Sequence, residues 1–349
     1  MTNITRRLMI VTLLVFLLAG LGLSGFWVFG ADRLRANLAQ WAEVWRAEGN
    51  HVAYKPFAVT GFPLYFRARL DDFAIAGGSA SAPWRWQTPT LRLRASPFAP
   101  TRARADFTGE HKVVAELFGV PVAFTAATKN GIARVQRRGS NQMGGVELHD
   151  SSLVIDGVSG SFTLKEALID AFYNRAAGSP TTPSAGLTVA LDDLILPAGL
   201  LPGQLGTRID SLNLDAEVMG AIGPELNTVT VAAWRDKGGT VEITDFALRW
   251  GPLRIKAEGT MALDADLQPL AAFTATMTGF NETIDLLVAE GALDPRDASA
   301  AKTLLSLLAK TPLTGGAPEI AAPLTIQNQR LSVGPVPLFT LRPIVWPAT

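Results

Sequence analysis

The longest apolar stretch of the chain runs from Leu8 to Gly30 and contains no charged residue in its twenty-three positions. Arg6 and Arg7 precede it, and Asp32 follows it. Since a helix rises about 1.5 Å per residue, this stretch would reach roughly 34 Å, which is enough to cross a hydrocarbon core of about 30 Å. The pattern therefore predicts a transmembrane helix within residues 1–30, after a short cytoplasmic stub.

Two interpretations of this helix are open. It is either an uncleaved signal-anchor or a signal peptide that is removed after Gly30, since Val28 and Gly30 are small enough to precede a cleavage site. The apolar core of a signal peptide is usually about 7–15 residues long, so the length favours the anchor. Arg6 and Arg7 would then stay in the cytoplasm and the bulk of the chain would lie outside it.

Residues 31–50 form an amphipathic pattern. Leu34, Leu38, Trp41 and Trp45 recur at helical spacing, and Gly49 with Asn50 supplies a helix stop. The tryptophans could lie in the lipid headgroup layer, or the apolar stripe could pack on the domain that follows. We favour the second interpretation, because a helix continuous with the anchor would point away from the bilayer.

Beyond residue 50 the apolar positions repeat every second residue. The clearest segment runs from Leu253 to Leu263, where apolar or small residues hold the odd positions and residues such as Arg254 and Glu258 the even ones. Tyr65–Leu70 and Leu91–Arg94 alternate in the same way, with arginine as the polar partner. This alternation is typical of antiparallel strands in a sheet that faces water on one side. We expect a β-rich domain over residues 51–349, with a possible subdivision near 176–186.

Helical patterns return late in the chain. Asn281 is a candidate cap for a short helix, and Asp294 with Pro295 predicts a second helix that reaches about Lys310. Residues 164–175 fit either a helix or a strand. The expected fold is mainly β: an N-terminal transmembrane helix, a large twisted antiparallel sheet that forms a groove or a roll, and a few late helices.

A loose repeat runs through the expected strands. In each copy an acidic residue interrupts the alternation and an apolar-x-apolar step resumes it. A carboxylate beside free backbone N–H groups could stabilise a bulge or a corner there and let a long sheet curve. The copies are Asp71–Ile75, Asp150–Ile155, Asp192–Leu196, Asp210–Leu214 and Asp245–Leu248.

Composition narrows the possible functions. The 31 basic and 31 acidic residues cancel, which gives no support for a nucleic-acid partner. Cysteine is absent, so disulfides and thiol nucleophiles are excluded. The three histidines are far apart in sequence, and the acidic pairs Asp71/Asp72, Asp192/Asp193 and Asp264/Asp266 stand at strand ends, where carboxylates usually cap turns. We therefore expect no catalytic residue, no metal ligand and no cofactor, and hence no enzyme.

Five short motifs stand out in the sequence: Gly61–Pro63, Trp234–Gly239, Leu248–Leu253, Gly259–Asp264 and Val333–Leu338. Together they resemble an uncharacterised alphaproteobacterial envelope family, designated domain of unknown function 2125. The family implies a bacterial inner-membrane protein with a single span and a β-rich domain in the periplasm, and it brings no known activity. The order of the elements is also similar to that of AsmA-type envelope proteins, whose curved sheets are thought to hold phospholipids; this second likeness is one of architecture only.

Two hypotheses of function follow. In the first, the apolar sheet face binds or passes lipid or other apolar molecules beside the membrane, because an uncovered face of this size would be too large for a soluble monomer. In the second, the face packs on itself and the protein is a non-catalytic scaffold or assembly factor for other envelope proteins. An enzyme would need a cleft that gathers the acidic pairs and a histidine. The candidate ligand-binding residues of the first hypothesis are Leu212, Leu214, Phe246, Leu253, Ile255 and Met261.

Overall fold

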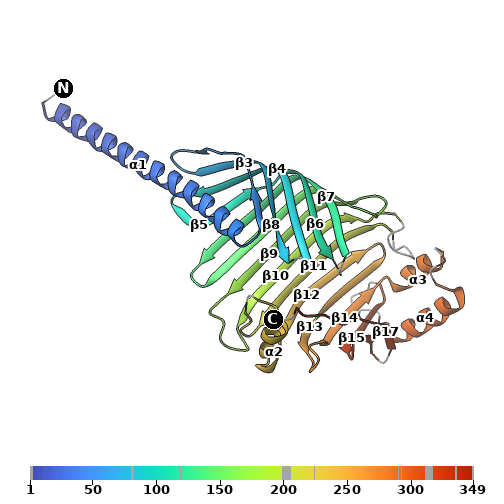
Figure 1. The fold of residues 1–349 in the computed structure, drawn as a ribbon. Helices are drawn as coiled ribbons and strands as arrows, with labels where there is room; N and C mark the ends of the chain where they lie inside the picture. The colour runs from blue at the N-terminus through green and yellow to red at the C-terminus, as the bar shows by residue number, and fades with distance from the viewer. Residues whose placement is uncertain are drawn as a thin grey trace. The chain divides into compact units, whose positions relative to one another are not determined.

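The computed structural model describes two compact units, residues 1–135 and 136–349, each built mainly from antiparallel strands (Figure 1). The mainly β fold predicted from the sequence is thus confirmed. The backbone is described for residues 3–79, 82–117, 120–198, 206–223, 225–289, 291, 293–310, 317–334 and 336–347. The side chains are described in the same ranges except those of residues 3–11, 79, 82, 117, 120, 304, 307, 308 and 336–339.

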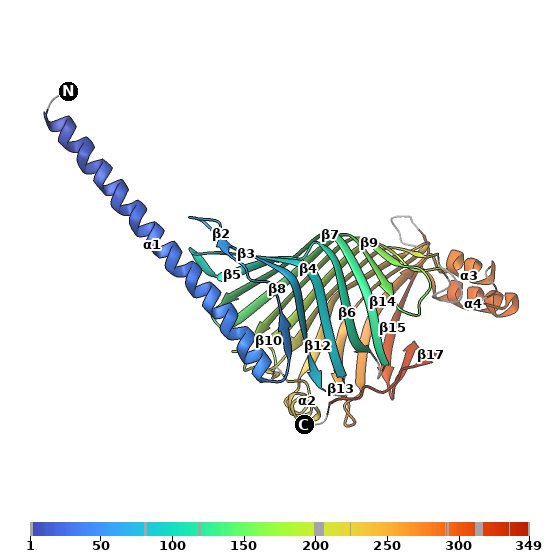
Figure 2. The ribbon, with the colours of Figure 1, turned by 45° about the horizontal axis from the view of Figure 1, so that its top comes forward.

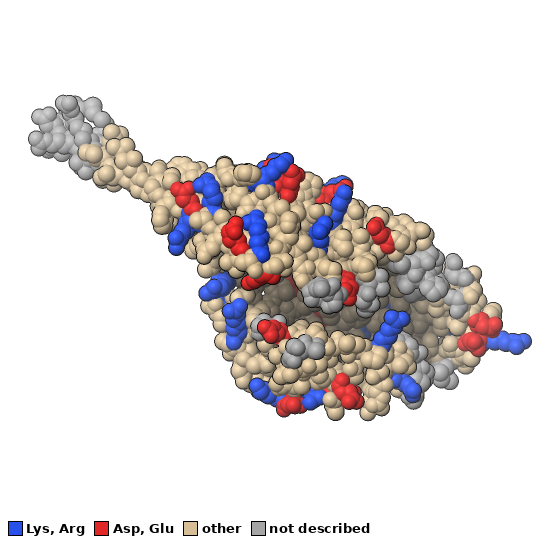
Figure 3. All heavy atoms as spheres, in the orientation of Figure 1, with Lys and Arg blue, Asp and Glu red and all other residues tan. Residues whose placement is uncertain are grey.

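The first unit opens with α1 (Asn3–Ala47), one continuous helix that contains both the apolar run and the amphipathic segment. From Thr12 onward it is long and apolar enough to cross a membrane. Figure 3 shows the described beginning of this helix as a stretch without charged side chains. The helix therefore fits a single-pass membrane anchor or a signal sequence.

The sheet of the first unit is built around β3 and β4, which pair along most of their length. β1 and β2 both pair with β3, at separate positions along it. β5 and β6 follow one another along the far edge of β4, and β6 pairs with β7, which continues past residue 135. The strands are β1 (His51–Ala53), β2 (Val59–Thr60), β3 (Phe66–Ser79), β4 (Ala82–Ser96), β5 (Ala99–Asp106), β6 (Gly109–Leu117) and β7 (Val120–Arg138).

The apolar stripe of α1 packs on this sheet. A Cβ atom added to Gly30 would lie only 2.5 Å from the Phe66 ring, so the helix and the start of β3 touch there. Near the end of α1, the Trp45 ring lies 6.3 Å from that of Trp84 on β4, centroid to centroid, and stacks on Trp41. This packing agrees with the interpretation that we favoured for the stripe.

A buried histidine lies next to the short connection between β5 and β6. Phe107, in the connection, donates its N–H to the Gly131 carbonyl of β7 (2.9 Å). His111, at the start of β6, is buried with 5% of its surface exposed. The Trp86 indole N–H donates to His111 Nδ1 (3.3 Å), and His111 Nε2 bonds the Phe107 carbonyl. Since an indole nitrogen can only donate, Nδ1 must be unprotonated and the ring neutral.

The pH dependence of stability tests this arrangement. Burial lowers the pKa of His111 from its usual 6.5, and the Phe107 carbonyl and the charge of Glu110 oppose the shift in part. The unfolded chain then binds the proton more readily, so the contribution to stability is complete above about pH 6.5 and is lost as the pH falls toward the folded pKa. We expect the Tm of the full chain in detergent to fall between pH 7.5 and 5.

Two substitutions assign this fall to His111. His111→Gln should lower the stability at pH 7.5 by about 1–3 kcal/mol, because it disturbs buried hydrogen bonds, and it should flatten the fall between pH 7.5 and 5. His51→Gln, at an exposed histidine of the same unit, should keep the slope of the natural protein. An unchanged slope in the His111 variant would contradict the assignment.

The second unit contains an up-and-down meander in which each strand pairs antiparallel with the next, from β8 to β17. Residues 164–175, which were ambiguous in the sequence, belong to a strand. The segment 176–186 contains the connection from β9 to β10 and the first residues of β10. The strands are β8 (Asn141–Ile155), β9 (Phe162–Asn174), β10 (Pro183–Ile195), β11 (Arg208–Met219), β12 (Thr240–Trp250), β13 (Leu253–Leu263), β14 (Pro269–Thr278), β15 (Glu319–Gln327), β16 (Arg330–Val333) and β17 (Val336–Thr340).

The acidic residues of the loose repeat do mark irregular points in the strands. Asp72, Asp150 and Asp193 have φ values of 52°, 46° and 57° inside their strands. Asp210 and Asp245 lie at shifts of register between neighbouring strands. A left-handed residue or a bulge interrupts the ladder and increases the local twist, and Asp tolerates this conformation better than most residues.

The described part of the second unit also contains three short helices: α2 (Thr228–Asp236), α3 (Phe280–Ala289) and α4 (Pro295–Leu308). Asp294 caps α4 as predicted. The prediction that Asn281 caps α3 is wrong, because α3 already begins at the buried Phe280, and the Gly279 carbonyl accepts the Thr283 N–H and hydroxyl. The sequence did not predict α2, which begins with a capping box between Asn227 and Thr230.

Candidate functional site

The six predicted ligand-binding residues lie on β11, β12 and β13 of the second unit. Leu214 pairs with Phe246, and Leu212 is joined through Leu248 to Ile255. Leu253 and Met261 lie further along β13, where alternate residues point to one side of the sheet. The structure thus brings these residues together, whereas their role as ligand contacts stays a prediction.

The apolar face continues far beyond these six residues. Two cross-strand rows of apolar side chains, here called the apolar rows, extend without a polar member over eight strands, from β8 to β15. One row consists of Leu148, Ala167, Leu191, Leu212, Leu248, Ile255, Met277 and Ile320. The other consists of Val146, Ile169, Val189, Leu214, Phe246, Ala257, Ala275 and Ala322.

The apolar rows are not a closed core. Ala167, Ala275 and Ile320 are buried, and the other members remain partly exposed. On the opposite face of the same strands, Asn213 and Lys256 are exposed. The rows therefore form the less exposed face of the sheet without being fully removed from solvent.

The described helices of the second unit lie at the ends of its strands. Trp234 of α2 donates to the Met219 carbonyl at the end of β11 (2.8 Å), whereas α3 follows the opposite end of the sheet, after Thr278. Figures 1 and 2 both show α3 and α4 beyond one end of the strands and α2 near the other. Among the described residues of this unit, no helix covers the middle of the apolar rows.

The first unit has an apolar cavity of about 260 Å³ between α1 and the sheet. Leu34 and Leu38 of α1 line one side, and Phe66, Leu93 and Ala105 are among the residues on the other. The cavity begins one helical turn after Gly30, where the apolar run ends. It is large enough for part of an acyl chain but not for a whole lipid.

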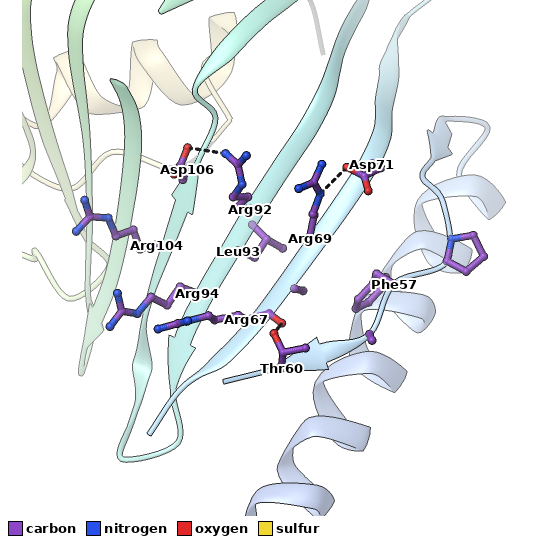
Figure 4. A pocket seen from close by; sticks show the side chains of 13 residues that line it. Phe57, Thr60, Arg67, Arg69, Asp71, Arg92, Leu93, Arg94, Arg104 and Asp106 are labelled. Atoms are coloured by element: carbon purple, nitrogen blue, oxygen red, sulfur yellow. Dashed lines mark hydrogen bonds and ion pairs between the residues drawn. The ribbon is translucent and has the colours of Figure 1, made fainter. Parts of the chain in front are cut away.

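A second cavity of about 710 Å³ in the same unit has a different character. Five arginines on three neighbouring strands line it, together with two aspartates and a few apolar residues (Figure 4). The alternation of β3 explains the arrangement, because Ala68 and Leu70 are buried on one face while the arginines occupy the exposed face. The arginines are Arg67, Arg69, Arg92, Arg94 and Arg104.

The two inner arginines are paired with carboxylates. Arg69 Nε lies 2.9 Å from Asp71 Oδ1, and Arg92 Nη1 lies 3.7 Å from Asp106 Oδ1. The hydrogen bond from Arg69, followed by that from Thr90, lowers the pKa of Asp71. Asp71 therefore holds Arg69 in place as a carboxylate at neutral pH, which leaves it poorly suited to act as a general acid or base.

The other three arginines have no carboxylate partner in the described part of the chain. Arg67 pairs with Arg94 across β3 and β4, and Arg94 pairs with Arg104 across β4 and β5. The Arg94 guanidinium lies over the Tyr65 ring, 3.6 Å from its centroid. Figure 4 shows the Arg67 and Arg94 side chains next to one another, with Arg104 on the adjacent strand.

Three other aspartates of the acidic pairs form ion pairs or hydrogen bonds that support the fold. Asp72 pairs with Lys55 (2.7 Å), Asp193 pairs with Arg208 (2.8 Å), and Asp264 accepts the N–H groups of Asp266 and Gln268 in a turn. In the described part of the chain, no three His, Asp or Glu side chains are grouped so that they could hold a metal ion.

Comparison with known proteins gives one positive result. A family model described as "Uncharacterized protein conserved in bacteria (DUF2125)" matches residues 27–342. The chain is a DUF2125 protein. Searches of curated proteins and of solved structures gave no match.

The match confirms the family that the sequence motifs resembled. It covers both units of this DUF2125 protein and begins at Trp27, in the last part of the apolar run. The alphaproteobacterial origin and the likeness to AsmA-type proteins stay predictions.

Sequence reasoning on this DUF2125 protein missed the arginine-lined cavity. The alternation in Arg67–Arg69 and Arg92–Arg94 indicates half-buried strands, but by itself it does not indicate a cavity. The repeated x-Arg-x-Arg pattern on three successive strands could have indicated a basic face. The register that aligns these strands depends on their turns, which the alternation alone does not define.

Proposed function

We propose that this DUF2125 protein is a non-enzymatic envelope protein that is held at the bacterial inner membrane by α1 and binds lipid acyl chains or other apolar molecules on the apolar rows. The bulk of the chain lies in the periplasm. The observation that carries the proposal is the continuity of the apolar rows over eight strands, most of whose side chains stay partly exposed.

The expected position of the protein at a membrane favours phospholipid as the ligand. A contiguous apolar surface of this extent is costly in water, and such surfaces mark interaction sites for ligands, membranes or partner proteins. Since α1 is long and apolar enough to cross a bilayer, phospholipid is the apolar molecule at the highest local concentration. The apolar cavity beside Leu34 and Leu38 supports the same ligand class in the first unit.

Photo-cross-linking with a phospholipid that carries a diazirine on its acyl chain tests the proposal. We expect cross-links in β11, β12 and β13 of the full chain reconstituted in nanodiscs, in addition to those in residues 8–30 that any anchored helix would give. The double variant Leu214→Gln and Ile255→Gln should reduce the sheet cross-links about tenfold or more, because burial of one leucine or isoleucine contributes roughly 2 kcal/mol.

The same strands supply a matched control. Asn213 and Lys256 are exposed on the opposite face, one residue from Leu214 and Ile255, so Asn213→Gln with Lys256→Gln should leave the cross-links unchanged. Cross-links confined to residues 8–30, together with a stable envelope protein bound to the sheet, would contradict lipid binding and favour the scaffold hypothesis.

A further inference from the structure

The start of the first sheet lies at the level where α1 would leave a bilayer. The Trp27 ring is 5.7 Å from the rings of both Phe62 and Phe66, and its indole N–H donates to the Tyr65 carbonyl (3.0 Å). Gly30, the last residue of the apolar run, touches Phe66. The turn from β2 to β3 is therefore fixed against residues 27–30, where tryptophan commonly marks the membrane interface.

β3 leads away from this level. It begins beside Gly30 at Phe66, and it ends near Gly77, where an added Cβ would lie 3.3 Å from the Trp45 ring. Since α1 also runs from Gly30 to Trp45, the strand and the helix share one general direction. Distance along β3 thus measures distance from the end of the apolar run.

Two turns at the near end carry exposed apolar side chains. Phe62 and Leu64 follow β2, and Phe98 lies between β4 and β5; their exposed fractions are 53%, 55% and 61%. The Ser96 hydroxyl donates to the Leu64 carbonyl (3.5 Å) and links the two turns. We call these three residues the turn tips. More than half of each side chain is left in contact with solvent, which is unfavourable unless a bilayer interface receives them.

The positive charge on the exposed face of β3, β4 and β5 decreases with distance from the turn tips. The first cross-strand row consists of Arg67, Arg94 and Arg104, which have no carboxylate partner among the described residues. The next row, about 7 Å further along the strands, contains Arg69, Arg92 and Asp106. Asp71 and Thr90 follow in the third row. Positive charge is thus highest next to the level of Gly30 and falls away from it.

We propose that the three arginines of the first row bind the phosphate groups of anionic phospholipids in the leaflet from which α1 emerges, while the turn tips insert among the headgroups. The headgroup layer extends about 5–8 Å beyond the hydrocarbon core, which matches the place of this row next to Gly30. Guanidinium groups match phosphate oxygens in geometry, and the exposed face of Arg67, Arg94 and Arg104 leaves their donors open to solvent. The inference rests on the proposed function only in keeping α1 in the membrane.

Lipid titration of the full chain in detergent micelles, followed by native mass spectrometry, tests the proposal. The natural protein should bind phosphatidylglycerol at least about tenfold more tightly than phosphatidylcholine with the same acyl chains. One basic side chain near an anionic surface strengthens binding roughly fivefold, and exposure reduces this gain. The triple variant Arg67→Gln, Arg94→Gln and Arg104→Gln should bind both lipids equally.

A second triple variant removes the same charge elsewhere. Arg85, on β4 outside the cavity, and Arg249 and Arg296 in the second unit are exposed, so their replacement by Gln should preserve the preference for phosphatidylglycerol. Equal affinity of the natural protein for the two lipids, or an equal loss in both triple variants, would overturn the proposal. Inorganic phosphate that binds as tightly as phosphatidylglycerol would overturn the assignment to lipid.

The absence of cysteine allows an independent measurement. Phe98→Cys labelled with the fluorophore NBD should show blue-shifted emission in nanodiscs. The same label at Val114, an exposed position on β6 of the same unit, should report water, because Val114 pairs with Arg85 and Arg85 with Ala76 near the far end of β3. Water-like emission from position 98 would overturn the insertion of the turn tips. The two proposals can fail separately. If the arginines do not bind lipid phosphate, the acyl-chain cross-links on β11–β13 should still form. If those cross-links are absent, the preference for phosphatidylglycerol should still be measured.

Discussion

Replacement of Leu17 and Leu18 by arginine is expected to abolish retention of the protein in membranes. Both residues lie near the middle of the apolar run, and both are exposed on α1, so nothing in the protein would shield the new charges. An arginine near the bilayer centre costs about 2.5–3.5 kcal/mol on insertion scales, so two would cost about 5–7 kcal/mol. Extraction of the membrane fraction with alkaline carbonate, followed by immunodetection of the chain, measures the effect.

The same helix provides the control. Ala36→Arg with Ala39→Arg adds equal charge at exposed positions beyond the apolar run, and this variant should stay in the membrane fraction. Amino-terminal sequencing of the natural protein accompanies the assay. A chain that begins at Ala31 would show a cleaved signal peptide and would contradict the anchor.

Replacement of Gly279 by alanine is expected to destabilise the second unit by about 2–5 kcal/mol. Gly279 connects β14 to α3 with φ of +75°, and an added Cβ would lie 1.9 Å from the Pro252 carbonyl oxygen, a backbone atom that cannot turn aside. The left-handed conformation costs an L-residue about 1–2 kcal/mol, and forced repacking typically costs about 1–3 kcal/mol more. Thermal unfolding of the full chain in detergent should show a Tm lower by roughly 8 °C for the transition of this unit.

Gly238 isolates the steric part of that cost. Its φ of +78° is nearly the same, but an added Cβ there would meet no atom within 4 Å. Gly238→Ala should therefore cost only the conformational penalty of about 1–2 kcal/mol. Equal losses in the two variants would show that contact with Pro252 does not restrict position 279.

Much of the fold could be predicted because one face of each strand is apolar. The odd positions from Leu253 to Met261 are apolar or small, and this alternation led directly to β13 and to the correct face. Asp294 and Pro295 likewise gave the start of α4, since their capping chemistry is local. In contrast, α2 was missed because nine residues hold too little periodicity, and its stability depends on the buried Trp234 contact with the end of β11.

The candidate sites were also predictable only in part. Leu212, Leu214, Phe246 and Ile255 were chosen from alternation, and the register does place them in neighbouring positions. That the rows extend from Val146 to Ala322 could not be predicted, because each step of register depends on a turn and on bulges such as the one near Asp245. The arginines of β3, β4 and β5 form a cluster only because the register of those three strands places them side by side.

The sequence by itself determined the apolar run from Leu8 to Gly30, the change of period after residue 50 and the absence of cysteine. These features depend on the chemistry of neighbouring residues, so local physics decides them. The tertiary structure alone decided that Trp27 and Gly30 hold the start of β3. It alone placed Arg67, Arg94 and Arg104 in one row beside that level. Cross-strand register converts residues that are distant in sequence into neighbours, and the hydrophobic pattern does not encode that register.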